Sequence, residues 1–156
     1  MLTLDIPGFK TLRLRHLVLD FNGTLAQDGR LLPGVAGRLE LLSRSLALHI
    51  LTADTHGTVQ AQVGPLNAAL IIIGRDQEAE AKVQVIRRLD ETATAAIGNG
   101  NNDRLMLAAA ALGIAVCQPE GLAITACLAA DLIVPDILSG LDLLLNPQRL
   151  LGTLRT

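Results

Sequence analysis

Four side chains of this sequence have the types and the order that transfer of a phosphoryl group to a carboxylate requires. Asp20 and Thr52 each follow a short apolar run, Lys82 stands early in an amphipathic segment, and Asp103 closes a run rich in Gly and Asn. A carboxylate can attack phosphorus, but two anions approach only when positive charge and hydrogen-bond donors surround them. The chain offers an attacking acid, a hydroxyl, an ammonium and a second acid.

Each group has a definite part in that chemistry. Asp20 would attack phosphorus, and Mg²⁺ held by Asp20 and Asp103 would neutralise the encounter. Lys82 would offset charge on the phosphoryl oxygens. Thr52 and the backbone amides of the turn at Gly23 would donate hydrogen bonds to the same oxygens.

Each group also has an ordinary structural interpretation. Asp20 precedes a turn, where aspartate is common, and Thr52 is a suitable helix N-cap. Lys82 would suit a solvated helix face, and Asp103 would suit the first turn of a helix. Their shared position favours the chemical interpretation, because the carboxyl ends of parallel strands lie along one edge of a sheet.

Short apolar strands alternate with amphipathic helices over most of the chain. Strands are expected at residues 17–19, 48–51, 70–73, 94–97, 113–116 and 132–134. Helices are expected at residues 34–45, 56–63, 77–89, 102–110, 119–128 and 137–145, with a further turn or helix at 147–155. Fully apolar strands are typical of a parallel sheet with both faces covered, so we predict a Rossmann-like α/β fold.

Two hairpins are expected outside this alternation. Residues 2–6 and 11–15 alternate around Pro7-Gly8, and the second arm is expected to run on into the first strand of the sheet. A shorter hairpin is expected around Asp28-Gly29, directly beside the proposed site at Asp20.

Composition predicts a single compact domain over residues 1–156. Hydrophobic residues make up 50% of the chain and charged residues 18%, which indicates a packed core rather than disorder. Two Phe, no Trp, no Tyr and a net charge of -2 argue against nucleic-acid binding.

The sequence also lacks membrane and export signals. No apolar run approaches the roughly 20 residues that span a bilayer, and the N-terminus has no signal-peptide pattern. Cys117 and Cys127 lie in apolar contexts and are expected to be buried, reduced thiols, with a disulfide as the alternative. We therefore expect a cytoplasmic protein without a membrane partner.

These residues resemble the motifs of the haloacid dehalogenase superfamily of phosphohydrolases. The run Asp20-Phe21-Asn22-Gly23-Thr24-Leu25 resembles the first motif, and Thr52, Lys82 and residues 98–103 stand in order at the positions of the other three. The resemblance covers about residues 16–135. It implies a haloacid dehalogenase fold with a mainly parallel sheet.

Within that superfamily the phosphorylation domain of P-type ATPases is the most similar. Its DKTGTL motif resembles residues 20–25, and its TGD motif resembles Thr52-Ala53-Asp54. Its GDGxND motif resembles Gly98-Asn99-Gly100-Asn101-Asn102-Asp103, and its GIA resembles Gly113-Ile114-Ala115. Small soluble P-type ATPase-like proteins are the nearest kind, because no transport segments are present here.

The resemblance implies an Mg²⁺-dependent phosphatase that forms an aspartyl phosphate on Asp20. The substrate would be a phosphorylated small molecule or another phosphomonoester. The implied catalytic residues are Asp20, Asn22 and Lys82; the phosphate-binding residues are Thr52, Ala53, Gly23 and Lys82; the metal ligands are Asp20, Asn22, Asp103 and Asn99.

Two departures from the family pattern affect this expectation. Asn22 stands where phosphatases of the family have an acid/base aspartate, and an amide cannot carry a proton at neutral pH. Asn99 replaces the first acid of the fourth motif, which removes one negative charge from the Mg²⁺ site. Slow turnover is therefore expected, although Asp54 is a weaker candidate for carrying the proton.

These departures leave other functions open. The alternative is a catalytically impaired binding or regulatory module of the same fold. A third hypothesis, an autophosphorylating ATPase-like protein, is weaker because the nucleotide-binding domain that P-type pumps insert after their first motif is missing.

No cap domain is expected to cover the site. Core elements fill the intervals from Asp20 to Thr52 and from Thr52 to Lys82. An open site would take a bulky substrate or be closed by a neighbouring subunit. Leu31, Leu32 and the Leu-rich C-terminal segment would supply apolar surface for a homo-oligomer.

Overall fold

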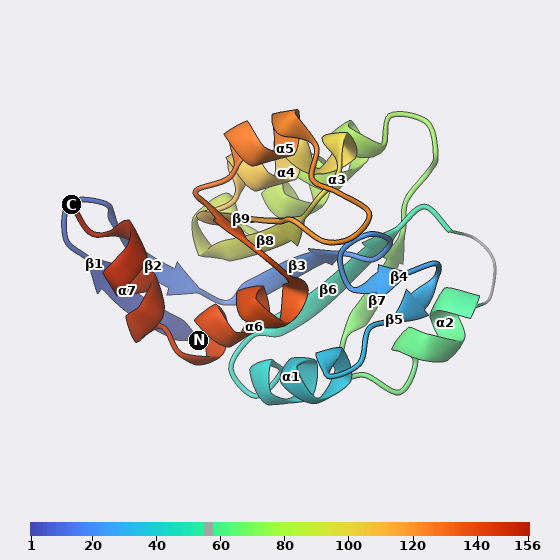
Figure 1. Ribbon diagram of the computed structural model, residues 1–156, viewed down its shortest axis with the longest axis horizontal. Coiled ribbons are helices and arrows are strands. Elements are labelled where there is room, and N and C mark those ends of the chain that lie inside the picture. Colours follow the sequence, from blue (N-terminus) through green and yellow to red (C-terminus); the bar gives the residue numbers. More distant parts are fainter. Residues whose placement is uncertain (55–57) are drawn as a thin grey trace.

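The computed structural model describes residues 1–54 and 58–156, and in these residues a six-stranded parallel sheet forms the centre of the molecule (Figure 1). Its strands are β3 (His16–Asp20), β6 (Ala47–Thr52), β7 (Ala69–Ile72), β8 (Thr94–Gly98), β9 (Leu112–Val116) and β10 (Leu132–Val134). They lie in the order β10-β9-β8-β3-β6-β7, and all neighbours are parallel. The predicted α/β class and parallel sheet are confirmed.

Helices cover both faces of this sheet (Figure 1). Helices α1 (Val35–Leu42), α2 (Thr58–Val63) and α6 (Ile137–Leu145) lie on one face, and helices α3 (Glu78–Leu89), α4 (Arg104–Ala109) and α5 (Ile124–Ala129) lie on the other. Alternate residues of β3 point to each side: Leu17 and Leu19 join the core under α1 and α6, while Val18 joins the core under α3 and α4. A strand with apolar residues on both faces is buried on both faces.

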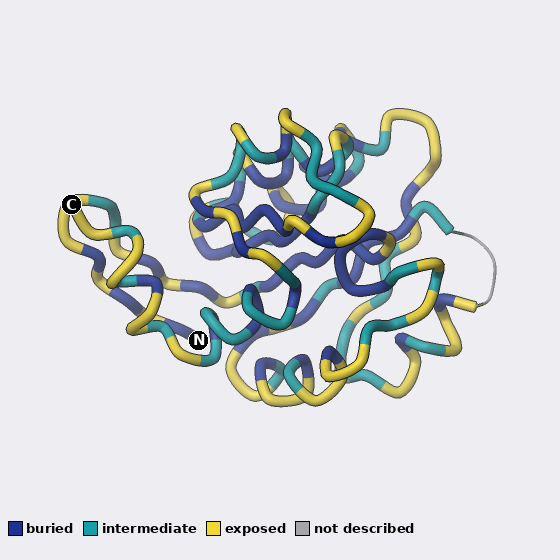
Figure 2. The backbone as a smooth tube through the Cα atoms, in the orientation of Figure 1, coloured by how far each residue is buried: buried dark blue, intermediate teal, exposed yellow. Residues whose placement is uncertain are grey.

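The central strand places Asp20 at the edge of the core. Leu17, Val18 and Leu19 are completely buried, and Asp20 ends the strand with 6% of its surface exposed. Figure 2 shows β3 buried along most of its length. The aliphatic core therefore fixes the position of an acid that the solvent barely reaches.

The two hairpins lie at opposite ends of the molecule (Figure 1). Strands β1 (Leu2–Ile6) and β2 (Lys10–Leu14) form one, and α7 (Gln148–Leu154) packs on it. The chain then passes across Arg15 from β2 into β3. Strands β4 (Ala26–Gln27) and β5 (Arg30–Leu31) form the other hairpin, beside the end of β3 that carries Asp20.

The first half of one predicted helix is wrong. Residues 119–128 were expected to be helical, but α5 begins only at Ile124 and the residues before it form a loop. Gly121 has a φ of 92°, which a helix cannot accommodate, and the Ala123 amide donates to the Asn99 carbonyl. The loop is therefore held by the fourth motif rather than by its own helical hydrogen bonds.

Smaller differences concern helix ends and the cysteines. Helix α1 ends at Leu42 rather than near residue 45, and a short 3₁₀ helix (Asn101–Asp103) precedes α4. Residues 56 and 57 of the expected helix 56–63 lie outside the described residues.

Both cysteines are free thiols, but Cys117 is exposed and Cys127 half-buried, so the expected burial is wrong. Within the described residues, the structure holds no helix of the length and apolar character that membrane crossing requires.

An ion pair between α1 and α6 makes a pH-dependent contribution to stability. Arg38 donates from Nε and Nη2 to the Asp142 carboxylate at 2.8 and 3.0 Å, and these bonds hold the pKa of Asp142 below its ordinary value of 3.8. The lowered pKa stabilises the folded protein fully above pH 3.8, and this contribution is lost as pH falls through the pKa of the folded state, which lies below 3.8. We expect Asp142→Asn to lower the melting temperature at pH 7 and to lower it progressively less as pH falls below 3.8, whereas Glu40→Gln on the exposed face of α1 has little effect at any of these pH values. A deficit in Asp142→Asn that stays constant with pH would contradict this account.

Candidate active site

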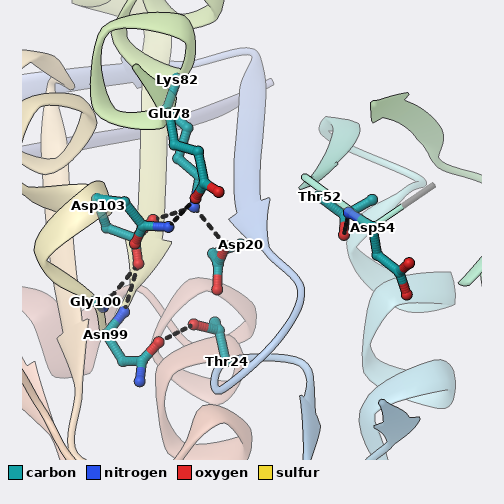
Figure 3. Close-up of polar contacts among 10 residues, drawn as sticks. Asp20, Thr24, Thr52, Asp54, Glu78, Lys82, Asn99, Gly100 and Asp103 are labelled. Atoms are coloured by element: carbon teal, nitrogen blue, oxygen red, sulfur yellow. Dashed lines mark hydrogen bonds and ion pairs between the residues drawn. The ribbon is translucent and has the colours of Figure 1, made fainter. Parts of the chain in front are cut away.

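A buried ammonium joins two acids at the carboxyl edge of the sheet. Lys82 on α3 donates from Nζ to Oδ1 of Asp20 and to Oδ1 of Asp103, both at 2.6 Å (Figure 3). Lys82 is 1% exposed and Asp103 is completely buried. Three groups that are distant in the sequence therefore share one desolvated contact.

The sheet register brings these groups together. Strands β3 and β8 are parallel neighbours with Leu19 opposite Ile97, so the chain beyond β8 starts beside Asp20. Gly98 permits the close approach of Asp103, because a Cβ there would lie 2.5 Å from the Asp103 carboxyl carbon. Helix α3 packs through Val85 and Ile86 on the same face of the sheet as α4. Lys82 lies one turn before these residues and therefore faces the carboxyl ends of the strands.

Burial and charge act against each other in this cluster. Burial, and then the charge of Asp103, raise the pKa of Asp20 to about 7, although Lys82 and Thr24 favour its charged form. Burial alone would lower the pKa of Lys82, but the two carboxylates outweigh it and raise that pKa. The ammonium therefore stays charged at neutral pH, and its single positive charge serves two acids, of which Asp20 is only partly ionised at that pH.

Asp103 has a second task in the loop after β8. Its Oδ2 accepts from the backbone amides of Asn99 and Gly100 at 2.9 and 2.8 Å. The same carboxylate therefore orders this loop and holds Lys82.

Asn99 connects this loop to the turn after Asp20. Its Oδ1 accepts from the Thr24 hydroxyl at 3.2 Å, and its Nδ2 donates to the Gly121 carbonyl at 3.1 Å. Gly23 has a φ of 78°, and a Cβ there would lie 2.8 Å from the Asn99 amide nitrogen. Glycine is therefore needed at position 23 for both its backbone conformation and the space it leaves.

Relatives by sequence cover only part of the chain. No family model matches it. The uncharacterized protein MJ0073 of Methanocaldococcus jannaschii is 53% identical over 60 residues, which are 38% of this chain and 64% of that protein. The uncharacterized protein MJ0072 of the same organism is 46% identical over 39 residues, which are 25% of this chain and 89% of that protein. The chain thus spans less than two thirds of the length of MJ0073.

Solved structures match over most of the chain. A 3-deoxy-D-manno-octulosonate 8-phosphate phosphatase from Moraxella catarrhalis, in complex with magnesium, phosphate and KDO, has a TM-score of 0.67 and 22% identity over 90% of each chain. A hydrolase of HAD superfamily subfamily III A from Legionella pneumophila has a TM-score of 0.67 and 19% identity, over 87% of this chain and 84% of that one. A zinc-transporting PIB-type ATPase has a TM-score of 0.63 and 27% identity, over 80% of this chain and 20% of that one.

The chain has the haloacid dehalogenase fold. Within residues 1–54 and 58–156, no cap domain is inserted between the strands of the sheet. The carboxyl edge of this haloacid dehalogenase fold holds Asp20, Lys82 and Asp103 in contact, with Asn99 linked to them through its backbone amide, which donates to Asp103.

Other predicted site residues of the fold lie around this cluster rather than in it. Thr52 is buried at the end of β6, where it is one residue beyond the partner of Asp20, and its hydroxyl accepts from the Asp54 amide at 3.0 Å. Figure 3 shows Thr52 and Asp54 to one side of the Asp20 cluster. Ala53 is half-buried between them, and Asn22 is exposed on the turn after Asp20.

The oxygen donors of the site would suit a weakly held dication. The described residues contain no cluster of three His, Cys, Asp or Glu side chains that could hold a metal. Asp20 offers a carboxylate at the surface of the core, Asn22 a backbone carbonyl and Asn99 an amide oxygen, while both oxygens of Asp103 already have partners. Mg²⁺ commonly uses one or two carboxylates and completes its shell with water and substrate phosphate, so these donors fit it.

Sequence reasoning missed two polar residues that hold the site. Gln118 follows β9 and is buried against the turn after Asp20, where it donates to the carbonyls of Gly23 and Thr24. Glu78 on α3 accepts from Asn102 at 2.5 Å and so ties α3 to the loop after β8. Neither residue belongs to a motif; only the place of Gln118 just after a predicted strand would have pointed to this edge.

Proposed function

We propose that this protein is a phosphatase that forms a phosphoenzyme on Asp20 and turns over slowly. The observation that carries the proposal is the buried ammonium of Lys82, bonded to the acid at the end of the central strand and to a second acid. A lysine loses solvation when it is buried, so a fold that keeps one at the strand ends has a use for positive charge there.

The first step transfers the phosphoryl group to the protein. The Asp20 oxygen that Lys82 does not bond attacks phosphorus; an Asp20 O–P bond forms, and the bond from phosphorus to the ester oxygen breaks. Lys82 offsets the negative charge that two anions bring together. The ester oxygen leaves as an alcohol after it takes a proton from water, because Asn22 has none to give. Mg²⁺, when bound by Asp20 with the oxygens of Asn22 and Asn99, would neutralise further charge.

The second step releases phosphate. Water attacks phosphorus, the Asp20 O–P bond breaks, and inorganic phosphate and the Asp20 carboxylate are restored as the water proton passes to solvent. A positioned base would accept that proton in an efficient enzyme. The exposed amide of Asn22 cannot, so hydrolysis of the phosphoenzyme is the slow step.

The fold supports a phosphomonoester substrate without naming one. The Moraxella catarrhalis relative by fold is a phosphatase in complex with magnesium, phosphate and a sugar acid. The absence of a cap in the described residues leaves the site open, so we propose a phosphorylated small molecule or another phosphomonoester. The cytoplasmic location and homo-oligomer expected from the sequence stay predictions.

A phosphomonoester panel tests the proposal. Purified protein is expected to release phosphate slowly from at least one ester when Mg²⁺ is present and to lose most of this activity when Mg²⁺ is left out. A covalent phosphate on the peptide that contains Asp20 is expected by mass spectrometry after acid quench. The alternative is a binding or regulatory module. It is supported by Asn22 and Asn99, because these residues replace the proton-carrying acid and one negatively charged metal ligand of the family pattern. Saturable binding of a phosphorylated ligand without release or adduct would favour the module and contradict the phosphatase.

Restoring a carboxylate at position 22 is expected to raise turnover. Asn22 is exposed on the turn after Asp20, so Asn22→Asp introduces an acid without burying its charge. A positioned acid/base typically contributes about 10²- to 10⁴-fold, and we expect kcat to rise by about 10²-fold in steady-state phosphate release. The control is Asn67→Asp, the same exchange at another exposed residue. Asn67 precedes the amino end of β7, whereas Asp20 lies at the carboxyl end of its strand, so the control is away from the site. An equal kcat in Asn22→Asp and wild type would mean that proton transfer does not limit the reaction.

A further inference from the structure

The loop between β9 and α5 lies against the turn that carries Asp20. Gln118, at the start of this loop, is 8% exposed, and its Nε2 donates to the Gly23 carbonyl at 3.1 Å and to the Thr24 carbonyl at 2.5 Å. Two successive carbonyls of the turn therefore share one buried amide. A glutamine carboxamide has two N–H groups, and both are used here.

The other end of the same carboxamide is also occupied. Its Oε1 accepts from the backbone amide of Ile137, the first residue of α6, at 3.3 Å. Gln118 thus links the turn after β3 to the beginning of a helix on the sheet. Since Ile137 and Leu141 of that helix are fully packed in the core, the anchor is rigid.

The turn that Gln118 fixes is the one that orients the side chain of Thr24. Thr24 is completely buried, and its hydroxyl donates to Asn99. The Asn99 side chain in turn donates to the Gly121 carbonyl, in the loop that begins with Gln118. Gln118, Thr24 and Asn99 therefore form a closed set of contacts around one side of Asp20.

We infer that Gln118 is a positioning residue for phosphoryl transfer to and from Asp20: it holds the backbone of Gly23 and Thr24, the turn that follows Asp20, so that the Asp20 carboxylate keeps its place both for attack on the substrate and for hydrolysis of the phosphoenzyme. This inference rests on the proposed function. Gln118 acts through the turn and does not touch the reacting atoms. Its loss is expected to reduce kcat while leaving the binding of substrate, measured as KM, nearly unchanged.

Gln118→Glu is the sharpest variant, because it changes only the donor end of the side chain. The carboxylate can still accept from the Ile137 amide, but it presents an oxygen instead of an N–H to the two carbonyls. We expect kcat to fall at least about tenfold and KM to change by less than about threefold. The deficit is expected to shrink as pH falls from about 7 to about 5, because a protonated carboxyl can donate again.

Gln62→Glu is the matched control. Gln62 on α2 also bonds the segment after Asp20, but it donates to the Gly29 carbonyl at 2.6 Å, in the β4–β5 hairpin. Its replacement removes the same kind of bond from the same segment, away from Thr24. We expect kcat within about twofold of wild type and no deficit that recovers at low pH.

Hydrogen exchange of the peptide that covers residues 19–26 supplies a readout besides activity. Faster exchange is expected in Gln118→Glu and in Gln118→Met, and unchanged exchange in Gln62→Glu. A folded Gln118→Glu protein with wild-type kcat would overturn the inference and leave the phosphatase proposal intact. If wild type hydrolyses no ester, the phosphatase proposal fails, and unchanged exchange in both Gln118 variants would then overturn the positioning role separately.

Discussion

Replacing Asp20 with Asn is expected to reduce phosphate release by about 10⁴-fold or more and to abolish the covalent adduct. Asn keeps the shape of Asp20 and an oxygen for the Lys82 ammonium at 2.6 Å, but an amide cannot attack phosphorus to give an acyl phosphate. The measurement is steady-state phosphate release with Mg²⁺, together with mass spectrometry of the quenched protein. Asp28→Asn, in the β4–β5 turn, is the matched control and is expected to keep near wild-type turnover.

The same variant is expected to be more stable than wild type at high pH. The pKa of Asp20 is about 7 in the folded protein, above its ordinary value of 3.8, so the folded state binds more protons between these values and loses stability as pH rises. Asp20→Asn lacks that loss. We expect a higher melting temperature than wild type at pH 8 and a smaller difference at pH 5. Equal phosphate release by Asp20→Asn and wild type would remove the proposed nucleophile, whatever the melting temperatures show.

Replacing Lys82 with Met is expected to lower the free energy of unfolding by about 3–5 kcal/mol at pH 7. The change leaves Asp20 and Asp103 facing each other without a cation between them. Water hardly reaches this region, because Lys82 is only 1% exposed in the wild-type protein. Removal of one partner of a buried pair leaves charge that neither water nor a counter-ion compensates. Urea unfolding followed by circular dichroism measures the loss, and phosphate release is expected to fall with it.

Two further variants identify the cause of that loss. Lys10→Met removes an exposed lysine that pairs with Asp131 at 3.4 Å, and it is expected to change stability little. Adding Asp20→Asn to Lys82→Met is expected to restore part of the stability, because one of the two uncompensated charges is gone. The deficit of Lys82→Met is also expected to shrink at low pH, where protonation neutralises the carboxylates. A loss as small as that of Lys10→Met would show that Lys82 does not compensate the two acids.

The parts of this fold that depend on local pattern could be predicted from the sequence. The fully apolar run before Asp20 indicated a buried strand, and the spacing of Ala81, Val85, Ile86 and Leu89 indicated an amphipathic helix that carries Lys82. The rule that parallel strands end along one edge was then enough to place Asp20, Lys82 and Asp103 together.

The parts that depend on tertiary contact could not be predicted. The loop before α5 was expected to be helical; the structure instead uses the left-handed φ of Gly121 and a bond to Asn99. Gln118 belongs to no sequence motif, and its role depends on hydrogen bonds to the carbonyls of two residues that lie far earlier in the chain. Thr52 was predicted correctly as a strand end, yet its hydroxyl is bonded to the Asp54 amide, which the strand pattern does not encode.

The place of β3 in the sheet has a consequence for synthesis of the protein. This strand ends at Asp20, but one of its two neighbours, β8, begins only at Thr94. On the ribosome, the nascent chain therefore holds an apolar strand with an unpaired edge until β8 has been translated. Such edges favour aggregation, and contacts this distant in sequence slow folding. The complete cluster of Asp20, Lys82 and Asp103 forms only after Asp103 has emerged, so a chain that ends before residue 103 cannot form the site.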